Sequence, residues 1–200
     1  MKIIIIGGTG TVGQAVVKEL SQRHTLIIAG HAKGDIQMDM TDTHSIAAMY
    51  KKVGSADAVV ITAGQVKFAP LSEMSAQQYA VGLQSKLMGQ VNLVLLGVNY
   101  LNEGGSFTLT SGILNQDPIR YGSSAAMVNG ALEGFVKSAA IEMPRNIRIN
   151  VVSPTVLEES IAHYADYFRG FDPVPAAKVA LAYSKSVEGA QTGQIYRVGW

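Results

Sequence analysis

Short apolar runs alternate with longer segments of helical period along the whole chain. The runs have the length and β-branched composition of strands, and they cover residues 2–6, 25–29, 35–38, 57–62, 106–110, 147–152 and 194–198. The intervening segments repeat apolar residues every three or four positions, as helices with one buried face do. These segments are 11–22, 42–53, 75–101, 121–142, 157–168 and 175–186. This alternation predicts an α/β fold, a single Rossmann-type doubly wound parallel sheet of about seven strands flanked by helices.

Composition supports a sheet that is covered on both faces. The chain has 200 residues, of which 48% are hydrophobic and 16% are charged. That length fits one domain over residues 1–200, with a full hydrophobic core. A formal net charge of +1 and the absence of any basic run give no electrostatic basis for binding nucleic acid.

Several locations and chemistries are disfavoured by the sequence. The chain has no cysteine, so disulfides and thiolate metal sites are excluded, and its four histidines show no metal-ligand spacing. No segment approaches the roughly 18 apolar residues that a membrane span needs. The apolar start at residues 2–6 leads into a glycine-rich turn instead of a cleavage site, which favours a first strand over a signal peptide. We expect a cytoplasmic protein with neither membrane nor nucleic acid as a partner.

Residues 7–13, Gly-Gly-Thr-Gly-Thr-Val-Gly, lie between the first predicted strand and the first predicted helix. In this context glycines permit a tight turn, close approach of the backbone to a pyrophosphate, and close packing of helix on strand. Unpaired N–H groups at the helix start then bind the phosphates. The alternative is a strand–turn–helix connection without a ligand. The predicted cofactor contacts in this turn are Gly7, Thr9, Gly10, Thr11, Val12 and Gly13.

The end of the second predicted strand bears on the choice between NAD and NADP. A carboxylate at this position favours NAD, because it accepts a hydrogen bond from the ribose 2′-hydroxyl. Here the strand runs into Gly30-His31-Ala32-Lys33, with no acid and two potential cations. His31 and Lys33 would attract a 2′-phosphate, so the sequence favours NADP, with NAD as the alternative. An ordinary solvated loop is the competing interpretation of these two residues.

Motifs in a fixed order along nearly the whole chain resemble the short-chain dehydrogenases/reductases. The glycines at 7, 10 and 13 match the spacing of the extended and atypical members. Residues 62–64, Thr-Ala-Gly, stand where the family has Asn-Ala-Gly, and residues 109–112 resemble its serine-bearing segment. Residues 148–154 resemble its Arg-Val-Asn segment, and residues 192–194 match the turn into its last strand. The resemblance implies further cofactor contacts at Asp39, Met40, Ala63, Gly64, Pro154 and Val156.

The resemblance also implies hydride exchange between a nicotinamide and a carbonyl or alcohol. In the family a tyrosine transfers the proton, a lysine one helical turn later lowers the tyrosine pKa, and a serine binds the carbonyl oxygen. Ser111 and Tyr121 take the serine and tyrosine positions here, but Ala125 stands at the lysine position. An unassisted tyrosine titrates at about 10 and is a poor base at neutral pH. Tyr121 is therefore equally open to interpretation as an aromatic residue that begins a helix.

Lys86 is the candidate replacement for the missing cation. Aligned on Gly89, it takes the place of a family asparagine that faces the active site from the long helix. Our hypothesis is that its long side chain reaches the tyrosine or the ribose from this neighbouring helix. The alternative is a surface lysine on an amphipathic helix.

Two departures from the family pattern shorten the chain. The helix that usually joins the second and third strands is absent, and the substrate-covering segment near residues 155–175 is small. This segment carries Tyr164, Tyr167, Phe168 and Phe171, which suit a pocket wall, a lid or a dimer contact. Because long helices of this family often pair across a two-fold axis, the resemblance implies a homodimer or homotetramer.

Three functions follow from these observations. The first is an NADP-dependent oxidoreductase of short-chain dehydrogenase/reductase type that acts on a small carbonyl or alcohol, with Ser111, Tyr121 and Lys86 as catalytic residues. The second is a dinucleotide-binding redox sensor or regulatory module without turnover, which Ala125 favours. The third is nucleotide-sugar epimerisation or dehydration, which shares the glycine spacing but usually needs a larger C-terminal region.

Overall fold

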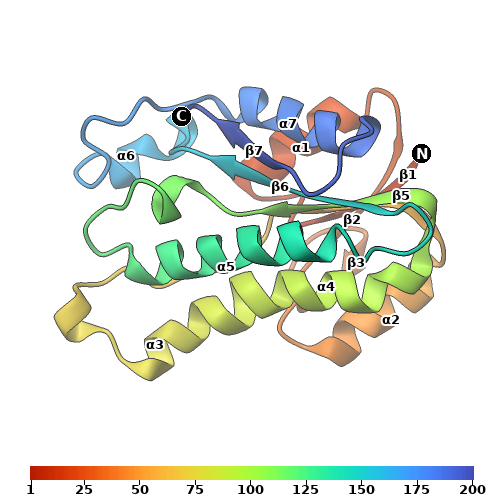
Figure 1. The fold of residues 1–200 in the computed structure, drawn as a ribbon, viewed down its shortest axis with the longest axis horizontal. Helices are drawn as coiled ribbons and strands as arrows, with labels where there is room; N and C mark the ends of the chain where they lie inside the picture. The colour runs from red at the N-terminus through yellow and green to blue at the C-terminus, as the bar shows by residue number, and fades with distance from the viewer.

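Seven parallel strands form one sheet through the middle of the molecule (Figure 1). The computed structural model describes all residues, 1–200. The strands are β1 (Lys2–Ile6), β2 (Thr25–Gly30), β3 (Ile36–Gln37), β4 (Ala56–Ile61), β5 (Leu101–Thr110), β6 (Arg148–Pro154) and β7 (Ile195–Val198). Their order across the sheet is β3-β2-β1-β4-β5-β6-β7, which confirms the predicted doubly wound fold. The order reverses between β1 and β4, and ligands of such sheets bind beyond the strand ends at this point.

Helices cover both faces of the sheet. α1 (Thr11–Leu20) and α7 (Ala176–Glu188) pack together on one face, whereas α2 (Thr43–Val53), α4 (Gln90–Gly97) and α5 (Ser123–Ala139) lie on the other (Figure 1). The isoleucines of β1 are buried on both faces of the sheet. Ile3 and Ile5 belong to the core under α1 and α7. Ile4 and Ile6 point the other way, into the core that includes residues of α2, α4 and α5.

The predicted helix over residues 75–101 is broken into distinct pieces. α3 (Ala76–Val81) continues into a π-helical segment, η2 (Gly82–Gly89), and then into α4 and a 3₁₀ turn, η3 (Val98–Tyr100). β5 begins already at Leu101, five residues before the predicted strand start, so the helical region ends earlier than predicted. π-Helical turns are rare in proteins, and those that occur are often found at functional sites. This one contains Lys86.

Two other helix predictions were wrong in extent. The helix predicted from Tyr121 begins at Ser123, because Tyr121 has a φ of 66° and Gly122 is also non-helical. The helix predicted over 157–168 is only a 3₁₀ turn, η5 (Glu158–Ser160), and a single turn, α6 (Ile161–Tyr164). A bridge between Leu157 and Val174 closes this segment into a loop, and the Glu159 carboxylate accepts hydrogen bonds from the Ala176 N–H.

The predicted absence of a helix between β2 and β3 is confirmed. Residues 31–35 form a short loop in its place. Asp35 ties this loop to the strand, because its backbone N–H donates to the Ile28 carbonyl and its carboxylate accepts from the Ile28 N–H, each at 2.8 Å.

Candidate active site and cofactor site

Two glycines of the turn between β1 and α1 are required by close packing. Gly7 has a φ of 82°, and a Cβ atom there would lie 2.8 Å from the Ala63 Cβ. A Cβ at Gly13 would lie 2.1 Å from the Gly7 carbonyl oxygen, so α1 packs directly on the turn. Gly10 is different, because its nearest neighbour in the same test is the Gly7 carbonyl at 3.5 Å. The outer side of the turn at Gly10 is therefore open.

The same turn presents a row of free backbone donors. The N–H groups of Gly8, Thr9, Thr11, Val12 and Gly13 have no acceptor within the chain. Gly10, the N-cap of α1, offers no side chain to satisfy them. Free N–H groups at the start of a helix form an anion site, so the donor set fits the pyrophosphate of a dinucleotide.

The loop after β2 carries the residues predicted to select the cofactor. His31 is exposed, and its Nε2 lies 4.0 Å from Oδ2 of Asp39. Lys33 is exposed and makes no hydrogen bond or ion pair within the chain. Asp39 is fixed by the backbone N–H and hydroxyl of Thr41, both at 2.8 Å, and these hydrogen bonds hold the pKa of Asp39 below its ordinary value. The structure thus brings His31 and Asp39 to one edge, with Lys33 free in the same loop.

Met40 and the residues after β4 line the interior of this edge. Met40 is buried, and a Cβ at Gly89 would lie 2.8 Å from its methyl carbon. Gly64 has a φ of 142°, and a Cβ there would lie 2.9 Å from the Cα of Lys86. The chain after β4 therefore packs directly on the π-helical segment.

Lys86 reaches the end of β5. Its Nζ donates to the Ser111 carbonyl at 3.0 Å, and the side chain is partly buried. Burial lowers the pKa of Lys86 to about 8, because a desolvated ammonium is less stable than a solvated one. Lys86 thus contacts the backbone of Ser111, the residue at the family's serine position, and it makes no hydrogen bond to Tyr121, the tyrosine that the hypothesis named as one target.

Gln90 holds the strand end against the helix. It is fully buried, and its amide exchanges hydrogen bonds of 2.9 Å with both the N–H and the carbonyl of Thr110. It also donates to the Lys86 carbonyl at 2.9 Å. Gln90 was not singled out from the sequence, although a polar residue in an otherwise apolar helix is a signal that could have found it.

Two further residues of α5 complete this polar cluster. Ser111 is buried and donates from its hydroxyl to Oε1 of Glu133 at 3.2 Å. Asn129 donates to the Gly112 carbonyl at 3.1 Å. Neither Glu133 nor Asn129 was predicted from the sequence. Both fall at helical spacing with buried Leu132 and Val136, which places them on the inner face of α5.

Tyr121 lies outside the hydrogen-bonded cluster. The residue is 40% exposed, and its ring packs edge-on against Tyr167, with ring centroids 5.6 Å apart. Its backbone carbonyl accepts from the Ala69 N–H, whereas its hydroxyl has no partner within the chain. Ala125, at the lysine position, is buried in a small apolar cluster. Lys86 and Ser111 are therefore linked by a hydrogen bond, whereas Tyr121 packs against Tyr167 in the segment that covers the substrate side.

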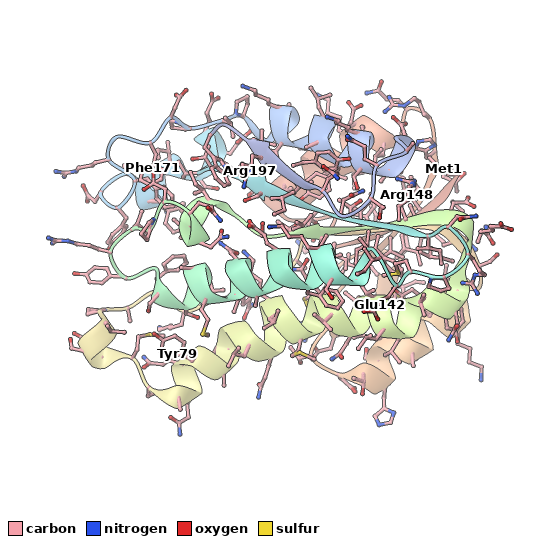
Figure 2. The ribbon with its side chains drawn as sticks, in the orientation of Figure 1. Met1, Tyr79, Glu142, Arg148, Phe171 and Arg197 are labelled. Carbon is pink, nitrogen blue, oxygen red and sulfur yellow. The ribbon has the colours of Figure 1, made fainter.

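The end of β6 anchors the substrate-covering segment. Beyond Pro154, Thr155 donates to the Val198 carbonyl and buried Val156 accepts from the Val174 N–H. The Trp200 indole donates to the Ser153 carbonyl at 2.9 Å. Phe171 of this segment and Tyr79 of α3 lie toward the same end of the molecule, beyond the strand ends (Figure 2). Both residues therefore lie at the end of the molecule where ligands of such sheets bind.

Fold and site together define a Rossmann-type protein with an anion-binding turn and a polar cluster at the end of β5. The family model described as enoyl-(acyl carrier protein) reductase matches residues 8–190. The chain belongs to the short-chain dehydrogenase/reductase family of oxidoreductases. No helix in the structure is long and apolar enough to cross a membrane.

Solved structures and curated relatives agree with this assignment. The protein lin1944 from Listeria innocua is 56% identical, with a TM-score of 0.98 over 99% of both chains. A small-chain dehydrogenase in complex with NADPH is 25% identical, with a TM-score of 0.89 over 99% of this chain and 96% of that one. The short-chain dehydrogenase/reductase ATR9 of Stachybotrys chlorohalonatus is 26% identical over 182 residues, which cover 76% of this chain and 72% of the relative.

Proposed function

We propose that the chain is an NADP-dependent oxidoreductase that transfers hydride between NADPH and a small carbonyl or alcohol. The observation that carries the proposal is the pairing of two features on one sheet edge. One is the turn with its row of free N–H groups, and the other is the contact between Lys86 and Ser111. The NADPH complex of a structural relative at 25% identity supports the same cofactor.

The cofactor would be held by the edge from β1 to β4. The donors of residues 8–13 would bind the pyrophosphate, and His31 with Lys33 would attract the 2′-phosphate. Asp39 and Met40 would border the adenosine, Ala63 and Gly64 the ribose, and Pro154 and Val156 the nicotinamide, as the family resemblance implies. When bound, the nicotinamide supplies or accepts the hydride.

The chain's own residues would handle the proton. Lys86, with a pKa of about 8, retains its proton at neutral pH and yet can exchange it within the working range of an enzyme. Ser111 would bind the substrate oxygen. Tyr121 remains the candidate proton donor from the family resemblance, and a role for it requires its exposed side chain to turn toward Ser111.

Calorimetric titration with NADPH and NADH, separately and at fixed salt, tests the cofactor. We expect tighter binding of NADPH, and loss of that preference in Lys33→Ala. A preference for NADH would overturn the 2′-phosphate argument and leave the oxidoreductase proposal standing. Binding of neither dinucleotide would end the oxidoreductase proposal.

A panel of small aldehydes, ketones and alcohols then tests turnover. We expect Ser111→Ala and Lys86→Met to lower kcat with cofactor affinity largely retained. A Lys86→Met variant with normal turnover would remove Lys86 from the catalytic set.

A redox sensor without turnover is the second candidate. It is favoured by Ala125 at the lysine position and by the location of the Tyr121 hydroxyl outside the Ser111 cluster. Tight NADPH binding without turnover of any substrate in the panel would favour the sensor over the enzyme.

A further inference from the structure

Glu133 is a buried carboxylate in the middle of α5. Only 4% of its surface is exposed, and its neighbours on the inner face of the helix include buried Leu132 and Val136. Burying a carboxylate is costly unless hydrogen bonds or an opposite charge compensate. Its one hydrogen bond within the chain comes from the Ser111 hydroxyl at 3.2 Å. A helix needs no charge at this position, so a buried carboxylate there points to a role beyond packing.

The opposite charge lies on the other side of Ser111. The Lys86 ammonium donates to the backbone carbonyl of Ser111, whereas Glu133 accepts from the side chain of the same residue. No direct ion pair joins Lys86 and Glu133. The two charges therefore meet at one serine, one from the π-helical segment and one from α5.

The other polar groups at this edge of the sheet are either uncharged or hydrogen-bonded to other residues. Gln90 and Asn129 are uncharged and bind backbone carbonyls at the end of β5. The Tyr79 hydroxyl is paired with Ser123 at 2.9 Å. The Asp39 carboxylate is held by Thr41. Glu133 is thus the charged side chain that shares a hydrogen-bonded network with Lys86.

We propose that Glu133 is a positioning residue, which fixes the Ser111 hydroxyl and supplies the negative charge that balances Lys86. The inference rests on the proposed function for its catalytic meaning. The Ser111 proton is directed at Glu133, so in this state the Ser111 oxygen is left to accept a hydrogen bond from the hydroxyl of an alcohol substrate. We expect the Glu133 carboxylate to oppose the effect of burial on Lys86, because a nearby anion favours the ammonium form.

Side-chain NMR of the lysines in the cofactor-free protein tests the charge balance. The Lys86 signal is assigned from its loss in Lys86→Met, and its titration is followed in the wild type, Glu133→Gln and Glu142→Gln. We expect Glu133→Gln to lower the Lys86 midpoint by about half a pH unit or more, because the balancing charge is gone. Glu142 is an exposed glutamate beyond the end of α5, so the same change there leaves the midpoint in place (Figure 2).

A second variant separates charge from hydrogen bonding and guards against misfolding. Glu133→Asp keeps the charge but is one methylene shorter, so it keeps the Lys86 midpoint near the wild-type value while loosening the hold on Ser111. An unchanged midpoint in folded Glu133→Gln, or the full downward shift in Glu133→Asp, overturns the proposal. The titration uses no cofactor or substrate, so its result is separate from whether the protein binds NADPH or turns over a carbonyl.

Discussion

In the turn between β1 and α1, a Cβ atom would clash with the backbone at Gly13 but not at Gly10. At Gly13 a Cβ would overlap the Gly7 carbonyl, at 2.1 Å, whereas at Gly10 it would meet only that same oxygen at 3.5 Å. Gly13 is therefore required by the packing of α1 on β1. Gly10, whose φ of −79° suits any residue, is required only if a ligand approaches the backbone there.

The first prediction separates folding from cofactor binding at this turn. Gly13→Ala should lower the free energy of unfolding by about 2 kcal/mol, because the backbone must shift to relieve the overlap. Gly10→Ala should leave the melting temperature nearly unchanged and weaken NADPH binding by about tenfold or more, because the methyl group blocks the pyrophosphate. Thermal melts and calorimetry measure the two effects. Equal NADPH affinity in Gly10→Ala would argue against phosphate binding at this turn.

At the scale of elements, a charged cluster joins the end of α1 to the end of α7. Just beyond α1, Arg23 contacts Glu188 at 2.8 Å and Glu19 at 2.9 Å, and His24 contacts Glu188 at 2.8 Å. The hydrogen bonds from Arg23 are the largest cause of the lowered pKa of both carboxylates. The cluster therefore fixes how two helices that cover the same face of the sheet pack together.

The second prediction concerns the pH dependence of this junction. A carboxylate with a lowered pKa stabilises the folded state above its unfolded pKa of about 4.5, and loses that effect as pH falls through the folded value. Arg23→Met should thus lower the melting temperature at pH 7, and the difference from wild type should shrink below about pH 4. Arg169→Met is the control, since its pair with Asp166 lies in a surface loop and both side chains are at least 80% exposed. A pH-independent difference in Arg23→Met would show that packing, not charge, links the helices.

At the scale of the whole molecule, one outer surface remains apolar. A groove of about 280 Å³ runs between α4 and α5, lined by Val94, Leu95, Val98, Phe135, Ser138, Ala139, Glu142 and Met143. Leu95 is 58% exposed on this groove. An apolar patch bordered by charge is typical of a protein interface. We expect the two long helices to pair here with those of a second copy of the chain.

The third prediction is that Leu95→Glu yields a monomer where the wild type is a dimer or tetramer. A buried, unpaired carboxylate opposes association. Leu181 of α7 is 56% exposed on the opposite face of the sheet, so Leu181→Glu is a matched control and should keep the wild-type mass. Light scattering after size exclusion measures the masses. A monomeric wild type would remove the predicted homo-oligomer.

The sequence by itself determined the sheet and its ligand edge. Four successive β-branched isoleucines followed at once by glycines favour a short strand that is buried on both faces and ends in a tight turn, and all four are buried in the structure. These are local constraints, so periodicity and steric demand were enough to predict them. The same argument failed over 157–168, where a bridge to Val174 and a carboxylate contact to Ala176 hold the chain as a loop.

Only the tertiary structure decided which polar side chains meet. Lys86, Gln90, Ser111 and Glu133 are separated along the chain and converge because two helices pack against the end of one strand. The family pattern directed attention to Tyr121, yet a positive φ and the contact with Tyr167 turn that residue away from the cluster. Sequence spacing reports neighbours along a strand or helix. Contacts between elements depend on register and helix packing, which no local pattern in one sequence encodes.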